Sequence, residues 1–131
     1  MGVRSLPAPG SAGLVLERLH RRFARLSRDV DEDEVPPTRA AQSACEGVLA
    51  SLSMRLPAGF PFPHVSTAGQ GDLFCEWRGE RATVLVFISS SGTVALHRIG
   101  TRSGQRQATP SATPDEVAEA IEWFEASNTP R

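Results

Sequence analysis

The residues with the greatest chemical potential are two cysteines, three histidines and the carboxylates near them. Cys75 is followed by Glu76, and His97 lies in a later apolar segment, so the three could supply a nucleophile and its base. A reactive thiol needs a partly exposed environment that stabilises the thiolate. Cys75 instead alternates with Leu73 and Trp77, as on the inner face of a strand. This alternation favours core packing, and we predict no catalytic residue.

The spacing of the metal-ligating residue types does not indicate a metal site. His20, His64 and His97 are widely separated, and neither HExxH nor CxxC occurs in the chain. Cys45 and Cys75 are too few for a disulfide framework, and both fall on apolar faces. The sequence therefore predicts no metal, no cofactor and no enzymatic activity.

Arginine is the residue type with the most distinctive placement. All 14 basic residues are Arg, which the codon bias of a GC-rich genome would explain. Arg binds carboxylates and phosphates in a bidentate geometry, so a row of Arg indicates an acidic protein partner or nucleic acid. A solvated helix face, neutralised by the acidic run DVDEDE at 29–34, is the alternative. One side of the amphipathic segment 14–28 carries such a row: Arg18, Arg21, Arg22, Arg25 and Arg28.

Size and composition are those of one small globular domain. The chain has 131 residues and a net charge of −1, so its bulk charge argues against a dedicated nucleic-acid binder. It contains no apolar run long enough for a membrane span or for the core of a signal peptide. We expect a cytoplasmic protein that has no membrane partner.

The elements that must position these residues follow from hydrophobic period and from turn signals. An apolar stripe at helical spacing marks 38–56, and Thr113, Pro114 and Glu116 form a capping-box signature before a final helix at 113–126. Between them we expect an extended connector, an antiparallel meander and a polar loop. The predicted strands are 72–78, 82–89 and 93–99. The predicted fold is therefore α+β, a three-stranded antiparallel meander packed with helices in the order α-α-β-β-β-α.

The predicted organisation has one folded domain preceded by a separate helix. Its parts are a disordered N-terminus at 1–13, the amphipathic basic helix at 14–28, an acidic and Pro-rich linker at 29–37, the α+β domain at 38–126 and a frayed tail at 127–131.

One segment resembles a group of small bacterial proteins. Pro61, Pro63 and Val65, followed by Gly71, Leu73, Cys75, Glu76 and Trp77, resemble a P-x-P-x-V segment and then G-x-I-x-L-E-W in those uncharacterised proteins. There a helix precedes the segment and a β-meander follows it. The resemblance covers about residues 38–125 and implies this fold and a bacterial origin, without an assigned activity.

The predicted sheet is apolar on both faces. Phe74, Leu85 and Phe87 alternate to the side opposite the expected core. At about 25 cal/mol per Å2 of apolar surface, leaving these three side chains in water forgoes several kcal/mol. We therefore expect a cover over this second face: the helix 14–28, another copy of the chain, or a different protein.

These patterns favour a binding function. We expect a small, non-enzymatic protein-binding or accessory module, such as an immunity protein, antitoxin or chaperone, that uses the second sheet face and the N-terminal helix. The predicted partner-binding residues are Phe74, Leu85 and Phe87, with Trp123 at the edge of the last helix. The partner is either another protein or a second copy of the chain, which would make a homodimer. The alternative is a nucleic-acid-binding protein that uses the Arg row of 14–28.

Overall fold

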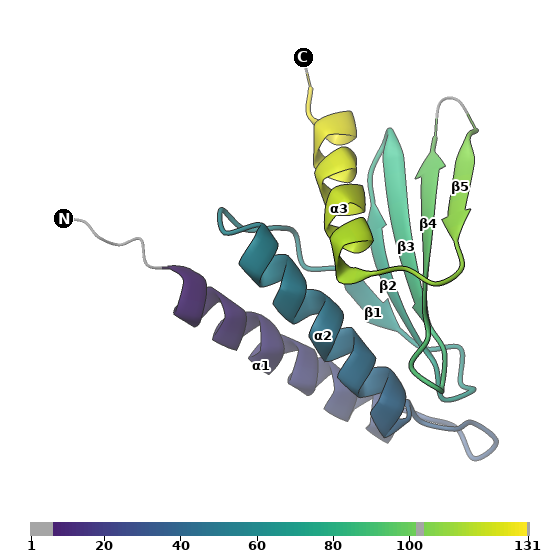
Figure 1. Cartoon of the computed structure of the whole chain (residues 1–131). Coiled ribbons are helices and arrows are strands. Elements are labelled where there is room, and N and C mark those ends of the chain that lie inside the picture. The colour runs from purple at the N-terminus through teal and green to yellow at the C-terminus, as the bar shows by residue number, and fades with distance from the viewer. Residues whose placement is uncertain (1–6, 102–103, 131) are drawn as a thin grey trace.

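The computed structural model describes residues 7–101 and 104–130, with side chains from residue 13 onward. Three helices and five strands follow one another along the chain (Figure 1). They are α1 (Pro7–Arg28), α2 (Arg39–Arg55), β1 (His64–Ser66), β2 (Leu73–Arg78), β3 (Ala82–Ile88), β4 (Val94–Gly100), β5 (Arg106–Thr109) and α3 (Pro114–Asn128).

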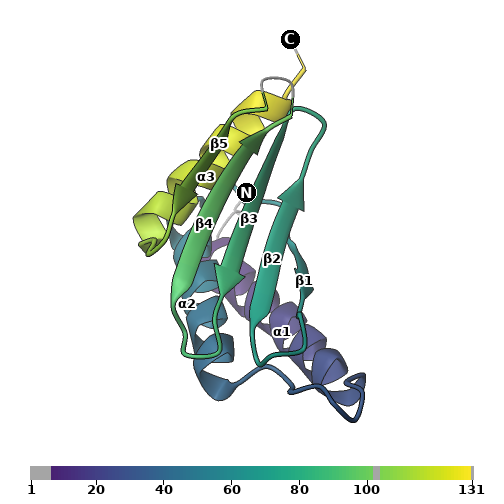
Figure 2. The ribbon, with the colours of Figure 1, turned by 90° about the vertical axis from the view of Figure 1, so that its right-hand side faces the viewer.

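The strands form one antiparallel sheet in the order β1-β2-β3-β4-β5. All three helices lie on one side of this sheet, and the other side faces the viewer uncovered in Figure 2. The predicted α+β class is confirmed, but the three-stranded meander was incomplete. It is extended by β1 on one edge and β5 on the other, so that the order is α-α-β-β-β-β-β-α.

Both of the missed strands are short edge strands with weak sequence patterns. β1 has three residues and directly follows Pro63, whose missing N–H is tolerated at the start of an edge strand. β5 reads RQAT and is mostly exposed, so no apolar alternation marks it. The connector and the polar loop that the sequence predicted here are correct only outside these strands.

The core lies between the helices and the inner sheet face. Cys75 and Val86 lie on this face and are fully buried, as are Leu49 of α2 and Ile121 of α3. Both cysteines are buried and free, which confirms the expected core packing. The predicted capping box at the start of α3 is also present, because the Thr113 side chain accepts from the Glu116 N–H while the Glu116 side chain accepts from the Thr113 N–H.

Helix α1 is part of the same core and does not cover the second sheet face. Its Leu19 is fully buried and its Phe23 is 4% exposed. α1 packs along α2, and a 2.6 Å hydrogen bond joins His20 Nε2 and Glu46 Oε2 across the two helices. The expectation that 14–28 covers Phe74, Leu85 and Phe87 within one chain is wrong, because its apolar stripe is used on the helical side.

The segments around this helix are more ordered than predicted. The α1 backbone is helical from Pro7 instead of residue 14, while residues 1–6 lie outside the described part of the chain. The 29–37 segment is tied to the connector, because the Val35 N–H donates to Gly69 O at 2.8 Å and the Thr38 N–H donates to Gly71 O at 3.1 Å. Gly71 has φ +85°, and a Cβ there would meet Thr38 and Ser90 side-chain atoms, so this close approach favours glycine.

The C-terminal end of α3 is anchored where a frayed tail was predicted. The helix continues to Asn128, whose Oδ1 accepts from the Arg81 N–H at 2.8 Å and from the Ala82 N–H at 3.2 Å. Its Nδ2 donates to Phe124 O at 2.8 Å. One carboxamide therefore ties the last turn of α3 to the start of β3, while residue 131 lies outside the described part of the chain.

Candidate functional site

The sheet face opposite the helices is not covered by another element (Figure 2), and three of the four predicted partner-binding residues lie on it. We call it the open face and define it by three rows of side chains that the strand register places side by side. The rows are Ser66-Phe74-Phe87-Ala95, His64-Glu76-Leu85-His97-Ala108 and Arg78-Thr83-Ile99-Arg106. No helix or strand within the described residues packs over these rows.

Two phenylalanines form the apolar centre of the open face. Phe74 and Phe87 are directly opposite each other on β2 and β3. Their ring centroids are 4.8 Å apart with an interplanar angle of 51°, which is a favourable tilted pair. Leu85 lies in the next row between Glu76 and His97. Three of the predicted partner-binding residues therefore share one surface.

The rings are partly buried by the sheet itself. Phe74, Leu85 and Phe87 are all of intermediate exposure because each is flanked by cross-strand neighbours. The cost of leaving them uncovered is therefore smaller than for fully exposed side chains. A single chain therefore does not require a cover over this face, although Phe74, Leu85 and Phe87 remain partly accessible.

Polar side chains surround this apolar centre. Glu76 pairs with Arg78 on the same strand at 2.8 Å, and His64 and His97 lie on either side of Glu76 and Leu85 in their row. Arg106 is exposed at the β5 edge. An apolar centre within a polar rim is the usual layout of a specific protein-binding surface.

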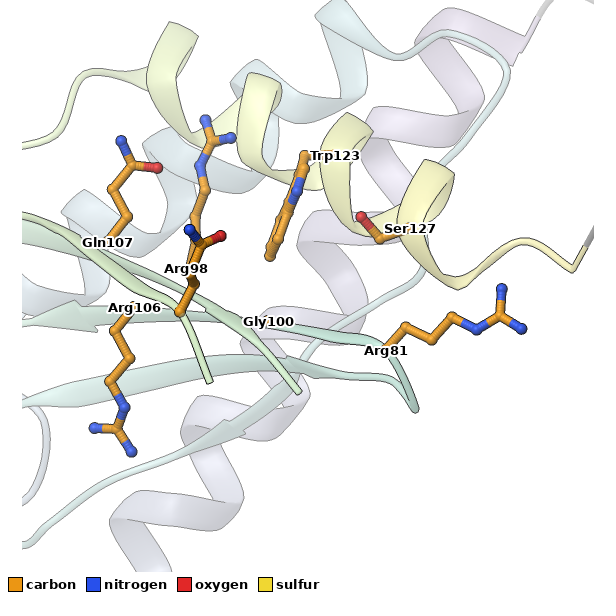
Figure 3. A pocket seen from close by; sticks show the side chains of 8 residues that line it. Arg81, Arg98, Gly100, Arg106, Gln107, Trp123 and Ser127 are labelled. Carbon is orange, nitrogen blue, oxygen red and sulfur yellow. The ribbon is translucent and has the colours of Figure 1, made fainter. Parts of the chain in front are cut away.

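Trp123, the fourth predicted partner-binding residue, lies on the other side of the sheet. It projects from α3 toward the inner face of β4, where the Arg98 guanidinium is 5.7 Å from its ring centroid (Figure 3). The structure therefore does not bring Trp123 together with Phe74, Leu85 and Phe87. Arg98 is a polar residue at a position where strand alternation predicts a core residue, and this irregularity is the sequence signal for the contact.

The cavity beside Trp123 has a volume of about 580 Å3 between α3 and the β4–β5 edge. Three arginines are among its lining residues, but not all of them point into it. Figure 3 shows Arg98 directed along the Trp123 ring, whereas Arg106 points to the opposite side of the sheet and Arg81 points away from the cavity. Arg98 is thus the one lining arginine that is directed along the indole ring.

The Arg row of α1 contributes to a second candidate site. Arg18, Arg21, Arg22 and Arg25 line one groove of about 330 Å3 with Phe62 and His64, which we call the Arg groove. Arg28 is exposed at the end of α1 and does not line the groove. Four of the five predicted arginines are therefore brought together.

Two of the groove arginines have structural contacts that the sequence did not reveal. Arg22 Nε donates to Val65 O of the edge strand β1 at 2.7 Å, and the Arg18 guanidinium is 4.1 Å from the Phe62 ring centroid. Within the described residues, Arg21 pairs with Glu17 of its own helix and with no other acidic side chain. Among the described residues, no ion pair joins the acidic run 29–34 to α1, so the predicted neutralisation of the Arg row is not seen.

The cysteine, glutamate and histidine that the sequence placed near one another do not assemble. Cys75 points into the core, whereas Glu76 and His97 lie on the open face. Cys45 Sγ is 3.6 Å from Cys75 Sγ. This hydrogen bond, together with burial, raises the pKa of the Cys75 thiol well above its ordinary value of 9.0. A neutral buried thiol is a poor nucleophile.

No three His, Cys, Asp or Glu residues within 7–101 and 104–130 are grouped as metal ligands would be. None of the helices in this part of the chain has the length and apolar character needed to cross a membrane.

Comparison with protein-family models, with curated proteins and with solved structures finds no match to this chain.

Proposed function

We propose that this chain is a small, non-enzymatic accessory protein that binds another protein through the open face. The observation that carries the proposal is that Phe74, Leu85 and Phe87 remain partly accessible together on the sheet face that no helix covers. Large contiguous apolar patches on monomeric proteins often mark interaction sites. Immunity proteins, antitoxins and chaperones of bacteria are the kinds of protein for which such a surface is suited.

The N-terminal helix has a different part in this proposal from the one the sequence suggested. Leu19 and Phe23 of its apolar stripe are buried in the core. The helix α1 therefore packs against α2 on the covered side of the sheet and does not contact the partner. The partner-binding set is correspondingly Phe74, Leu85 and Phe87, without Trp123 and without the apolar side of α1.

Replacement of Phe87 by glutamate tests the proposal. Immobilised Phe87→Glu chain should fail to retain, from an extract of its own cells, a protein that the wild-type chain retains. The matched control is Met54→Glu, because Met54 is 81% exposed on α2 and receives the same apolar-to-acidic change. The retained protein, once purified, should form a complex with wild type and with Met54→Glu only. Equal retention by Phe87→Glu, or the absence of any retained protein, a second copy of the chain included, would contradict the proposal.

Nucleic-acid binding is the second candidate, favoured by the convergence of four arginines on the Arg groove. Contacts to phosphates release counterions, so binding of a labelled single-stranded oligonucleotide should weaken as salt increases. The double change Arg21→Glu with Arg25→Glu should abolish it, while leaving the structural contacts of Arg18 and Arg22 intact. An unchanged fluorescence polarisation of the oligonucleotide with wild-type chain at low salt would exclude this candidate.

A further inference from the structure

We propose that the occupant of the open face is a second copy of this chain, packed face to face about a two-fold axis that runs parallel to β3. The inference rests on the proposed function, because it names the partner of the same surface. Two identical sheets that face each other are related by a two-fold axis that lies in the plane between them. Such an axis can run along the strands or across them, and each choice brings different residues together.

An axis along β3 places Phe74 opposite a small residue. It exchanges β2 of one copy with β4 of the other, while β3 faces its own equivalent. In the first row, the register Phe74↔Phe87↔Ala95 then places Phe74 opposite Ala95 of the second copy. Phe87 meets its own equivalent on the axis. Each Phe74 ring therefore fills the space above Ala95 beside a central pair of Phe87 rings, as in the interdigitated core of stacked sheets.

The same axis matches polar groups in the second row. Here Glu76, Leu85 and His97 are in register on β2, β3 and β4. Glu76 of each copy is placed opposite His97 of the other, and an imidazole can donate a hydrogen bond to a carboxylate in either protonation state. Leu85 meets its own equivalent between these two symmetric pairs. The row is therefore complementary to itself.

An axis across the strands produces an unfavourable arrangement. It would place β2 opposite β2. An axis through the Glu76 row brings Glu76 opposite Glu76 of the second copy, so that two carboxylates face each other, and moves Phe87 opposite Thr83. An axis midway between this row and the Phe74 row brings Glu76 opposite Phe74 of the second copy, which places a carboxylate against an aromatic ring. Charge and shape both favour the axis along β3.

The size of the face sets the strength of association. Five strands about 4.8 Å apart and a rise of about 3.4 Å per residue make the face roughly 20 Å across in each direction. About 400 Å2 per copy, or about 800 Å2 in total, is below the size of a stable specific interface and is typical of weak, transient ones, so the dimer should be weak and concentration dependent. Stacked sheets cross at about 30° because of their twist. The crossing displaces the edge strands most, so the proposed residue pairs are confined to β2, β3 and β4, which lie next to the axis.

Thiol cross-linking tests the orientation directly. Both native cysteines are 0% exposed, so an introduced cysteine is the reactive one for a short bismaleimide that spans about the 10 Å between stacked sheets. Thr83→Cys lies on the proposed axis and should cross-link to itself. Glu76→Cys should not cross-link to itself, but its mixture with His97→Cys should give a covalent heterodimer. Self-linking of Glu76→Cys without self-linking of Thr83→Cys would overturn the proposed axis.

A charge exchange supplies the second test and leaves the core untouched. His97 is exposed, and its replacement His97→Glu would place a carboxylate opposite Glu76 of the second copy at two symmetric positions. This change should raise the dimer dissociation constant at least tenfold. The double change Glu76→His with His97→Glu restores complementary pairs and should restore dimerisation. Equal dissociation constants for all three chains would overturn the pairing.

The outcomes also separate this inference from the proposed function. A wild-type chain that stays monomeric but binds a different protein in a Phe87-dependent manner would overturn the second-copy inference and leave the function standing. The absence of any Phe87-dependent partner, including a second copy, would overturn both.

Discussion

At the scale of single residues, the buried thiols illustrate how far sequence alternation can be trusted. The alternation of Leu73, Cys75 and Trp77 correctly predicted that Cys75 faces the core. It could not show that Cys45 Sγ of α2 would lie 3.6 Å from Cys75 Sγ, because that contact depends on how the helix packs across the sheet. The same limit applies to Arg22 and Val65 O, whose hydrogen bond joins residues 43 positions apart.

The raised pKa of Cys75 predicts an alkaline loss of stability. A thiol whose pKa is higher in the folded chain keeps its proton longer there than in the unfolded chain. Its contribution to stability is therefore complete below the unfolded pKa and falls as the pH rises above about 9. The chain has no Tyr and all its basic residues are Arg, so few other groups titrate in this range.

Chemical denaturation at several pH values measures this effect. The free energy of unfolding should decrease from about pH 9 upward in the wild-type chain. The decrease should be shallower in Cys75→Ala, whatever that change costs through lost packing at neutral pH. Parallel curves for the two chains would contradict a proton held by Cys75 in the folded state.

At the scale of elements, the strongly patterned segments were predictable and the edges of the sheet were not. The helices α2 and α3 and the strands β2 and β3 have a clear apolar period or a cap, because each buries one face against the core. The strand β4 was predictable from its turn and its apolar residues, although Leu96 is its only buried residue. β1 and β5 have few inward positions and are held largely by backbone hydrogen bonds to neighbours. Such pairing leaves little trace in side-chain pattern.

The placement of α1 shows a related limit. Its amphipathic pattern correctly predicted a helix with one buried side, but two apolar surfaces were available to receive it. The arginines beside the stripe make contacts that favour the helical side of the sheet. Arg22 donates a hydrogen bond to Val65 O at the edge strand β1, and the Arg18 guanidinium lies over the Phe62 ring. Contacts of this kind protect an edge strand from pairing with other chains.

A pair of alanine substitutions measures this role of α1. Arg22→Ala removes the donor to Val65 O and should lower the free energy of unfolding by about 1.5–3 kcal/mol, the usual range for hydrogen bonds to charged groups. Arg21→Ala is the control, because the ion pair of Arg21 is with Glu17 of its own helix. This substitution should lower the free energy of unfolding by less than about 0.5 kcal/mol. Equal losses in urea denaturation would show that Arg22 has no special role at the β1 edge.

At the scale of the whole molecule, the helices and the sheet form two layers, with one sheet surface left accessible. The sequence predicted which residues make that surface apolar, since Phe74, Leu85 and Phe87 alternate away from the core. It did not predict that Glu76, Leu85 and His97 lie in one row, because β4 must first be aligned with β3. Trp123 was predicted to bind a partner because it lies outside the apolar stripe of its helix, but the stripe does not show that it lies on the other side of the sheet from Phe87.

Sedimentation equilibrium of the wild-type chain and of Phe87→Glu tests most directly whether the open face binds a second copy. The wild-type mass should rise with concentration from the 14.1 kDa of one chain toward twice that value. Phe87→Glu should remain at the mass of one chain, and Met54→Glu should behave like wild type. A wild-type mass that stays at 14.1 kDa at every concentration, or a dimer that Phe87→Glu leaves intact, would contradict this account.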